Sequence, residues 1–112
     1  AMRYMFLIYD DETYARAADP ALFAEYGTFS DMVRQDGVLR ATDPLRPTAT
    51  STTVRVRDGN AVITDDPFAE TKEQLGGYYI LDCEDLDEAL RYAAQIPSAR
   101  FGSIEVRPIL ET

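Results

Sequence analysis

The sequence predicts a small α+β domain with a ferredoxin-like core, in which two helices pack on an antiparallel sheet. Three observations predict this fold. Short apolar segments typical of strands recur along the chain, two of them are followed by apolar residues at helical spacing, and a β-hairpin is inserted between the two β-α-β halves. At 112 residues the chain is long enough for one core, so we expect a single domain over residues 2–112.

The first expected strand, residues 3–9, is apolar on both of its alternating faces. A strand of this composition has to be covered on both sides. The acidic run at residues 10–12 then predicts an exit into solvent.

Asp19-Pro20 predicts the start of a helix, because a carboxylate caps the first N–H groups and proline fits the first turn. Gly37 stands where a left-handed residue ends a helix. Gly27, inside the helix, costs about 1 kcal/mol relative to alanine, which suggests that it allows close packing. The apolar stripe between these points is Leu22, Tyr26, Phe29 and Val33.

Residues 38–41 predict a second strand, and residues 43–47 a loop. Residues 52–64 predict the hairpin, since two valines alternate with two arginines and Asp58-Gly59 offers a turn. After the hairpin we expect a charged loop with one helical turn over residues 71–75, ended by Gly76-Gly77. Residues 78–81 then predict a strand that is again apolar on both faces.

The last part of the chain predicts a helix and a final strand. Asp85 and Glu88 resemble a capping box that opens a helix, which stops before Pro97. Residues 103–107 alternate apolar and charged side chains, as a strand does. Two helices can cover one face of the sheet, so we expect a second copy of the chain to cover the other face in a homodimer.

The charge balance restricts the partners. The chain carries 20 acidic and 11 basic residues, a net charge of −9, which repels phosphate backbones and anionic lipids. We therefore expect neither a nucleic-acid partner nor a membrane partner, and no apolar stretch approaches the length of a membrane span. The single cysteine, Cys83, excludes an internal disulfide and favours a reducing, cytoplasmic location.

The residue types exclude several chemistries. There is no histidine, which excludes Ser-His and Cys-His nucleophile pairs and histidine-based zinc sites. Cys83 lies among acidic residues that raise the pKa of a thiol, so we interpret it as an inert residue at a strand end. We expect no resident metal ion or cofactor.

The densest polar cluster follows the hairpin. Asp65 is the candidate general base, and Lys72 the candidate group that stabilises a developing anion. The planar fork of Arg107 could bind a carboxylate ligand. Alternatively, Arg107 and Glu105 lie on a solvated strand edge or form an ion pair with each other across the dimer. The alternative for the loop is a tight anchor with solvated charges. The candidate ligand-binding residues are Phe68, Glu70, Glu73, Tyr78 and Arg107.

The sequence from Thr64 to Tyr79, TDDPFAETKEQLGGYY, resembles the signature of the DGPF branch of the YCII-related family. The beginning (residues 3–5), the hairpin (residues 53–59) and the end (residues 104–108) are similar to that family too. The resemblance implies a dimeric α/β-barrel fold and a largely uncharacterised bacterial protein. It also implies a possible association with alternative sigma factors, beside which relatives are sometimes encoded or to which they are fused.

Two positions depart from the family pattern. Asp66 stands where the family has glycine, and before Pro67 it favours extended backbone. Other YCII-related branches carry a His-Asp pair suspected of catalysis, and a chain without histidine cannot reproduce it.

Three functions remain open. The first is a cytoplasmic dimer with a small-molecule cleft beside residues 65–78 and cofactor-free acid-base chemistry. The second is a non-catalytic regulatory or interaction module, for example for a sigma factor. The third is a dimer domain without a ligand. An enclosed cleft at Asp65 would favour the first, and an exposed apolar patch near Phe68 the second.

Overall fold

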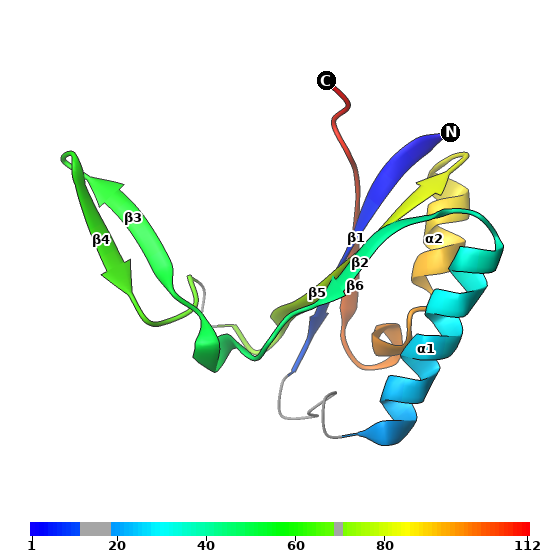
Figure 1. Cartoon of the computed structure of the whole chain (residues 1–112), viewed down its shortest axis with the longest axis horizontal. Helices are drawn as coiled ribbons and strands as arrows, with labels where there is room; N and C mark the ends of the chain where they lie inside the picture. The colour runs from blue at the N-terminus through cyan, green and yellow to red at the C-terminus, as the bar shows by residue number, and fades with distance from the viewer. Residues whose placement is uncertain (12–18, 69–70) are drawn as a thin grey trace.

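The computed structural model describes residues 1–11, 19–68 and 71–112. A four-stranded antiparallel sheet in the order β2-β5-β1-β6 carries two helices on one face, and β3 and β4 form a separate hairpin (Figure 1). This arrangement confirms the predicted ferredoxin-like α+β fold. The elements, in order, are β1 (Met2–Asp10), α1 (Pro20–Gln35), β2 (Leu39–Pro44), η3 (Thr48–Thr50), β3 (Thr53–Arg57), β4 (Asn60–Thr64), β5 (Gln74–Cys83), α2 (Leu86–Ala93), η4 (Pro97–Arg100) and β6 (Ser103–Pro108).

The core lies between the sheet and the two helices. Alternate residues of β1 point into it, and Phe6 at its centre is fully buried. The ring of Phe29 on α1 meets the ring of Tyr79 on β5 edge-on, with 5.1 Å between their centroids. The buried residues of this core are Tyr4, Phe6, Ile8, Phe29, Val33, Tyr79, Leu81, Cys83, Ala89, Ala93 and Ile96.

The local signals for helix starts and turns are confirmed. Asp19 Oδ1 accepts a hydrogen bond from the backbone N–H of Ala21 at 3.0 Å, and Asp85 Oδ1 accepts one from Glu88 at 2.9 Å. Gly37 has a φ of 75° after α1. Asp58 and Gly59 also have positive φ angles, as a tight hairpin turn requires.

The strand β5 is longer than predicted. It begins at Gln74, so the helical turn expected over residues 71–75 is wrong, and Gly76-Gly77 lies inside the strand. The pairing with β1 extends the strand, because Gln74 and Leu75 are opposite Asp10 and Tyr9. A side-chain Cβ at Gly77 would lie 3.1 Å from the carbonyl oxygen of Asp43, so glycine here lets β2 come close.

Three smaller expectations are also wrong. The second strand covers Leu39–Pro44, so Asp43 belongs to a strand and not to a loop. Asp10, expected to lead into solvent, is only 2% exposed. A Cβ on Gly27 would meet nothing within 4 Å, so this glycine is not needed for close packing. Glu12 and Glu70 lie outside the described residues.

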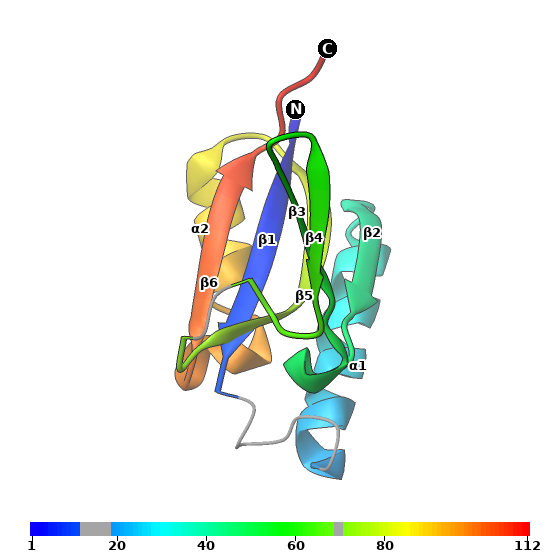
Figure 2. The same ribbon diagram turned by 90° about the vertical axis from the view of Figure 1, so that its left-hand side faces the viewer.

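The β3–β4 hairpin, which we call the arm, projects from the body on the side of the sheet that has no helices (Figures 1 and 2). The radius of gyration is 15.7 Å. A compact domain of this length has a value of about 13 Å, so the arm makes the molecule unusually extended. No helix among the described residues is long and apolar enough to cross a membrane.

Candidate functional site

The sheet has a face that no helix covers, and we call it the open face. Its centre is formed by Met5, Leu7 and Tyr9 of β1 with Tyr78 and Ile80 of β5, all half-buried. Met5 is opposite Ile80, and Leu7 is opposite Tyr78, so the side chains of each pair lie side by side. An apolar band of this kind is suited to bury a ligand or another protein surface.

A hydrogen-bonded pair lies at the edge of the open face. The Tyr78 hydroxyl donates to Asp43 Oδ2 at 2.7 Å, and the two residues are opposite each other in the β2–β5 pairing. The hydrogen bond to the carboxylate, followed by desolvation, raises the pKa of Tyr78. The phenol therefore stays protonated at neutral pH and fixes the orientation of the Asp43 carboxylate.

Asp43 is not among the candidate residues that the sequence indicates, because the strand predicted from the sequence ends at residue 41 and residues 43–47 are predicted as a loop. The signal that could have identified it is the strand pairing, which places Asp43 opposite a tyrosine already singled out. Sequence spacing alone does not contain that contact, because the two residues are 35 positions apart.

Two of the predicted site residues, Asp65 and Phe68, lie at the base of the arm. Asp65, just after β4, has an exposed side chain. Phe68 is 76% exposed, and the guanidinium of Arg55 on β3 lies 5.3 Å from the centre of its ring. The hydroxyl of Thr53 donates to the backbone carbonyl of Asp66 at 2.6 Å and ties this turn to the arm.

The other predicted residues belong to the sheet or lead into it. Lys72 is exposed just before β5. Glu73 is half-buried, and its Oε1 accepts a hydrogen bond from the hydroxyl of Ser103 on β6 at 2.8 Å. Arg107 is exposed on β6 opposite Met5, and therefore on the open face. The structure thus divides the predicted cluster between the open face and the arm.

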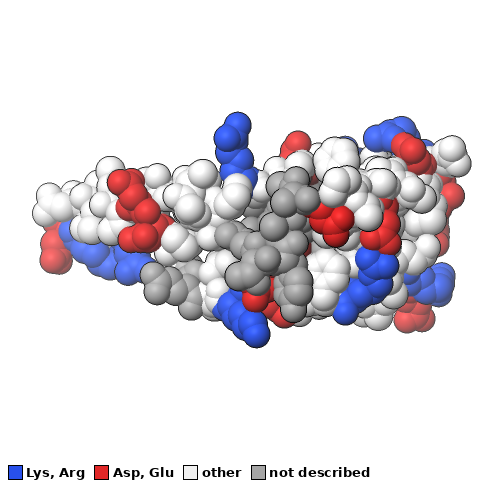
Figure 3. Space-filling model, turned by 90° about the horizontal axis from the view of Figure 1, so that it is seen from below, with Lys and Arg blue, Asp and Glu red and all other residues white. Residues whose placement is uncertain are grey.

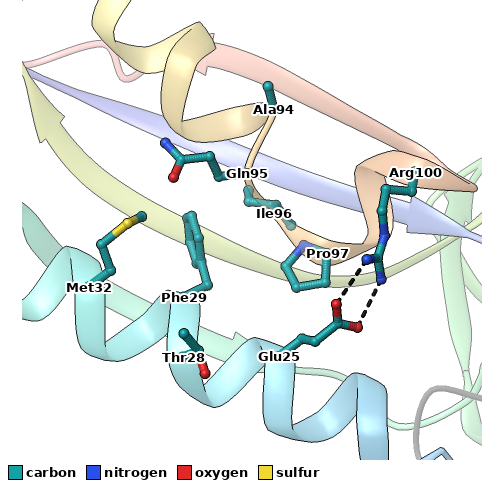
Figure 4. Close-up of a pocket in the computed structure, with 9 residues that line it drawn as sticks. All are labelled: Glu25, Thr28, Phe29, Met32, Ala94, Gln95, Ile96, Pro97 and Arg100. Carbon is teal, nitrogen blue, oxygen red and sulfur yellow. Dashed lines mark hydrogen bonds and ion pairs between the residues drawn. The ribbon is translucent and has the colours of Figure 1, made fainter.

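Two shallow hollows lie on the helical side of the sheet. The larger, about 290 Å³, lies between α1 and η4 over Phe29, Met32 and Ile96 (Figure 4). At its edge, Arg100 donates two hydrogen bonds of 2.8 Å to the Glu25 carboxylate. Asp65 lines neither hollow, so neither of them is the enclosed cleft at Asp65 that would favour the small-molecule function.

A buried polar chain joins β1, η4 and α1. The hydroxyl of Ser98 donates to Asp10 Oδ2 at 3.1 Å, and its oxygen lies 2.5 Å from the Tyr26 hydroxyl. Because Ser98 gives its only proton to Asp10, Tyr26 is the donor to Ser98. Ser98 is fully buried and therefore closed to a substrate, which indicates a bracing role for this chain.

A comparison with known protein families shows to which family this chain belongs. The YCII-related domain matches residues 2–112. The chain belongs to the YCII-related family. Uncharacterized protein R00369 of Rhizobium meliloti (strain 1021) is 37% identical over 114 residues, covering 96% of this chain and 92% of that protein. The family resemblance predicted from the motif is confirmed.

A solved structure shares the fold of this YCII-related chain. It is 5-chloro-2-hydroxyhydroquinone dehydrochlorinase (TftG) from Burkholderia phenoliruptrix AC1100, in complex with 2,5-dihydroxybenzoquinone. The TM-score is 0.58 and the sequence identity 14%, over 99% of this chain and 96% of the other. At this identity the likeness establishes the fold alone.

Cys83 of this YCII-related chain is fully buried at the end of β5. Burial, together with the charges of Glu88, Asp82 and Asp85, raises the pKa of the thiol to about 11 from an ordinary 9.0. The thiol ionises more easily in the unfolded chain. Its contribution to stability is therefore complete below about pH 9 and is lost as the pH rises through 11.

We expect the native protein to resist a thiol reagent at about pH 8 and to react at once when unfolded. We also expect the free energy of unfolding to fall more between about pH 8 and 10.5 in the wild type than in Cys83→Ala. Denaturant titrations of the wild type and of Cys83→Ala at the two pH values measure these free energies of unfolding. Equal losses in the two proteins would mean that the thiol does not ionise differently in the folded state.

Proposed function

We propose that this YCII-related chain works in the cytoplasm as a homodimer that binds a small organic molecule beside the open face. We further propose that it performs acid-base chemistry on that molecule without a resident cofactor. The observation that carries the proposal is the Tyr78–Asp43 pair at the edge of a half-buried apolar surface. Once a second copy covers this surface, the apolar residues and the few polar groups that converge on it would line a cleft of the kind that small molecules occupy.

In the proposed reaction, a carboxylate takes a proton from the bound molecule, and the bonding electrons remain on the molecule as an anion. Asp65 and Asp43 are the candidate bases. The hydrogen bond from Tyr78 leaves Asp43 Oδ1 as the oxygen that accepts the proton. Arg107, on the same face, or Lys72 stabilises the anion.

The surface area supports the dimer. The chain exposes 7537 Å², whereas a folded monomer of this size exposes about 6,200 Å². The excess of about 1,300 Å² exceeds the roughly 800 Å² that each partner buries in a standard interface. The buried, single cysteine supports the cytoplasmic location, because nothing in the sequence requires an oxidising compartment.

The shared fold supports the class of ligand. The dehydrochlorinase described above binds a dihydroxylated quinone on the same scaffold. A flat ring with acidic hydroxyl groups would suit the apolar band of the open face, with Arg107 at its margin for the negative charge. We therefore take 2,5-dihydroxybenzoquinone and related hydroxylated aromatic acids as the first probes.

Isothermal titration calorimetry with this probe panel tests the ligand site. We expect Tyr78→Phe and Asp43→Asn to weaken binding of the best probe by about tenfold or more, which is about 1.4 kcal/mol, since the first removes the hydrogen bond that orients the Asp43 carboxylate and the second removes the charge of that carboxylate. Asp65→Ala and Lys72→Ala decide whether these residues join the site. We expect each to weaken the binding as well.

The matched control is Tyr92→Phe. Tyr92 donates to Asp36 Oδ2 at 2.7 Å, which is the same phenol–carboxylate chemistry on the helical side. We expect this variant to bind the probe as the wild type does. Equal weakening by Tyr92→Phe and Tyr78→Phe, or no effect of either, would remove the open face as the site. No binding of any probe would end the small-molecule proposal.

A second candidate function is a protein-interaction module. The observation that favours it is the exposure of Phe68 at the base of an arm with exposed valines, away from both hollows. An alternative sigma factor is the proposed partner. Co-sedimentation of the purified chain with such a factor, lost in Phe68→Ala, would favour this function over the ligand site.

A further inference from the structure

The arm has two chemically different faces. The strand pairing places Val54 opposite Ile63 and Val56 opposite Ala61, so these four side chains share one face. The other face carries Arg55 and Arg57, with Val62 opposite Arg55. We call the first of these the apolar arm face. Figure 3, in which the arm extends to the left, shows basic side chains along its lower margin, acidic side chains at its tip and nearer the body, and uncharged atoms over much of the rest.

The apolar arm face is open to water in the single chain. Val54, Val56 and Ile63 are 62%, 64% and 65% exposed. A two-stranded hairpin is marginally stable without packing, and exposed β-branched residues on it add the cost of hydrated apolar surface. The opposite face has a partner within the chain, because Arg55 lies over the ring of Phe68. The apolar arm face therefore needs cover from elsewhere.

We propose that the apolar arm face docks on a second copy of this chain, so that each subunit's arm lies against the body of the other. The inference rests on the homodimer of the proposed function and adds an interface to it. The arm projects on the side of the open face, which is also uncovered (Figures 1 and 2). A copy bound to that face would therefore meet the arm as well.

The charges favour a copy of the chain as the occupant. The segment from residue 45 to residue 72 carries four basic and four acidic residues, so the net charge of −9 belongs to the rest of the chain. Two such bodies repel each other when they approach. An arm without net charge can approach an acidic body without that penalty.

The dimensions favour the same occupant. The molecule measures 47 × 39 × 18 Å, and the arm accounts for its extended form. The excess surface of about 1,300 Å² is larger than a standard interface needs on each side. An arm that adds its own apolar face to the open face accounts for this excess better than sheet contact alone.

The first test compares two identical substitutions on opposite faces of the arm. Val56→Asp puts a charge on the apolar arm face, and Val62→Asp puts the same charge on the face with the arginines. By sedimentation velocity over a dilution series, we expect the dimer dissociation constant to rise at least 30-fold in Val56→Asp and less than threefold in Val62→Asp. Circular dichroism should show the same fold in both, because the arm is exposed.

The second test identifies what the arm touches. Cys83 is buried, so Val56→Cys provides the one reactive thiol among the described residues, and it takes a benzophenone maleimide. Light and ¹⁵N-labelled chains are mixed, irradiated and analysed by mass spectrometry. We expect cross-links between light and heavy chains that run from the arm to residues of the partner's sheet. Cross-links within one chain, or from arm to arm, would overturn the proposal.

The outcomes separate this inference from the proposed function. A wild type that sediments only as a monomer overturns the dimer and the docked arm together. A dimer that Val56→Asp leaves intact overturns the arm alone. Leu7→Asp on the open face tests the sheet contact independently, and calorimetry with the probe panel tests the ligand site whatever the arm does.

Discussion

Phe6→Ala lowers the free energy of unfolding by about 3–5 kcal/mol, the usual cost of emptying a buried phenylalanine site. Phe6 is fully buried at the centre of β1, and its neighbours across the sheet are Tyr79 on β5 and Val106 on β6. Phe6 belongs to a buried cluster with residues from the sheet and from both helices, so the surrounding side chains close the vacated space only in part. Urea denaturation followed by circular dichroism measures the loss.

The control for Phe6 is the next residue along the chain. Leu7→Ala truncates a half-buried side chain on the open face, so we expect a loss of about 1 kcal/mol in the dilute, monomeric protein. At high protein concentration the loss should grow, because the same change weakens the proposed dimer. If Leu7→Ala costs as much as Phe6→Ala at every concentration, the open face is a core surface and not an interface.

Gly102→Ala is expected to destabilise the protein by more than about 3 kcal/mol, above the usual range for an overpacked site. A Cβ at Gly102 would clash with the backbone carbonyl oxygen of Tyr9 and would lie 3.0 Å from Asp10 Cβ. Backbone atoms of a central strand cannot move aside. The turn before β6 would have to shift, and with it the buried contact of Ser98 with Asp10.

Gly27→Ala is the matched control for Gly102→Ala. A Cβ at Gly27 would meet nothing within 4 Å, and the residue lies inside α1. Alanine has the better helix propensity, so we expect a gain of up to about 1 kcal/mol. Thermal and urea denaturation of both variants give the comparison. Similar effects in the two would mean that crowding at residue 102 does not decide the outcome.

Local chemistry predicted the features that depend on neighbours in the chain. Asp19 and Asp85 cap helices because each carboxylate reaches an N–H group two or three residues further on. Asp58-Gly59 turns the hairpin because both residues accept a positive φ. The two-sided apolar pattern of β1 predicted that both of its faces need cover, and because two helices cover one face, it predicted a second apolar face that no helix covers.

Features that depend on distant partners were missed. Two glycines normally weaken a strand, yet β5 runs through Gly76-Gly77, because β1 on one side and β2 on the other supply the pairing. Asp10 looked like part of a solvated acidic run, and it is buried because Ser98, 88 residues later, donates to it. Burial of a carboxylate depends on such a donor, which the spacing of acidic residues does not reveal.

The residues of the candidate site also fall into two groups, those that could be predicted from the sequence and those that could not. Tyr78 and Arg107 were identified from residue type and strand position, and both lie on the open face. Asp43 was missed because its role depends on the β2–β5 register. The roles proposed for Asp65 and Lys72 remain predictions, since both side chains are exposed in the single chain.

The root of the arm is closed by the sheet itself. Pro44 and Gly77 are opposite each other in the β2–β5 pairing, and the N–H of Leu45 donates to the carbonyl of Gly76 at 2.9 Å. Everything between these points is an insertion whose ends already meet. Natural selection can therefore lengthen, shorten or rewrite the insertion while the strands on either side stay paired. Changes confined to this one module would alter the proposed contact of the arm and leave the hydrogen bonds of the sheet as they are.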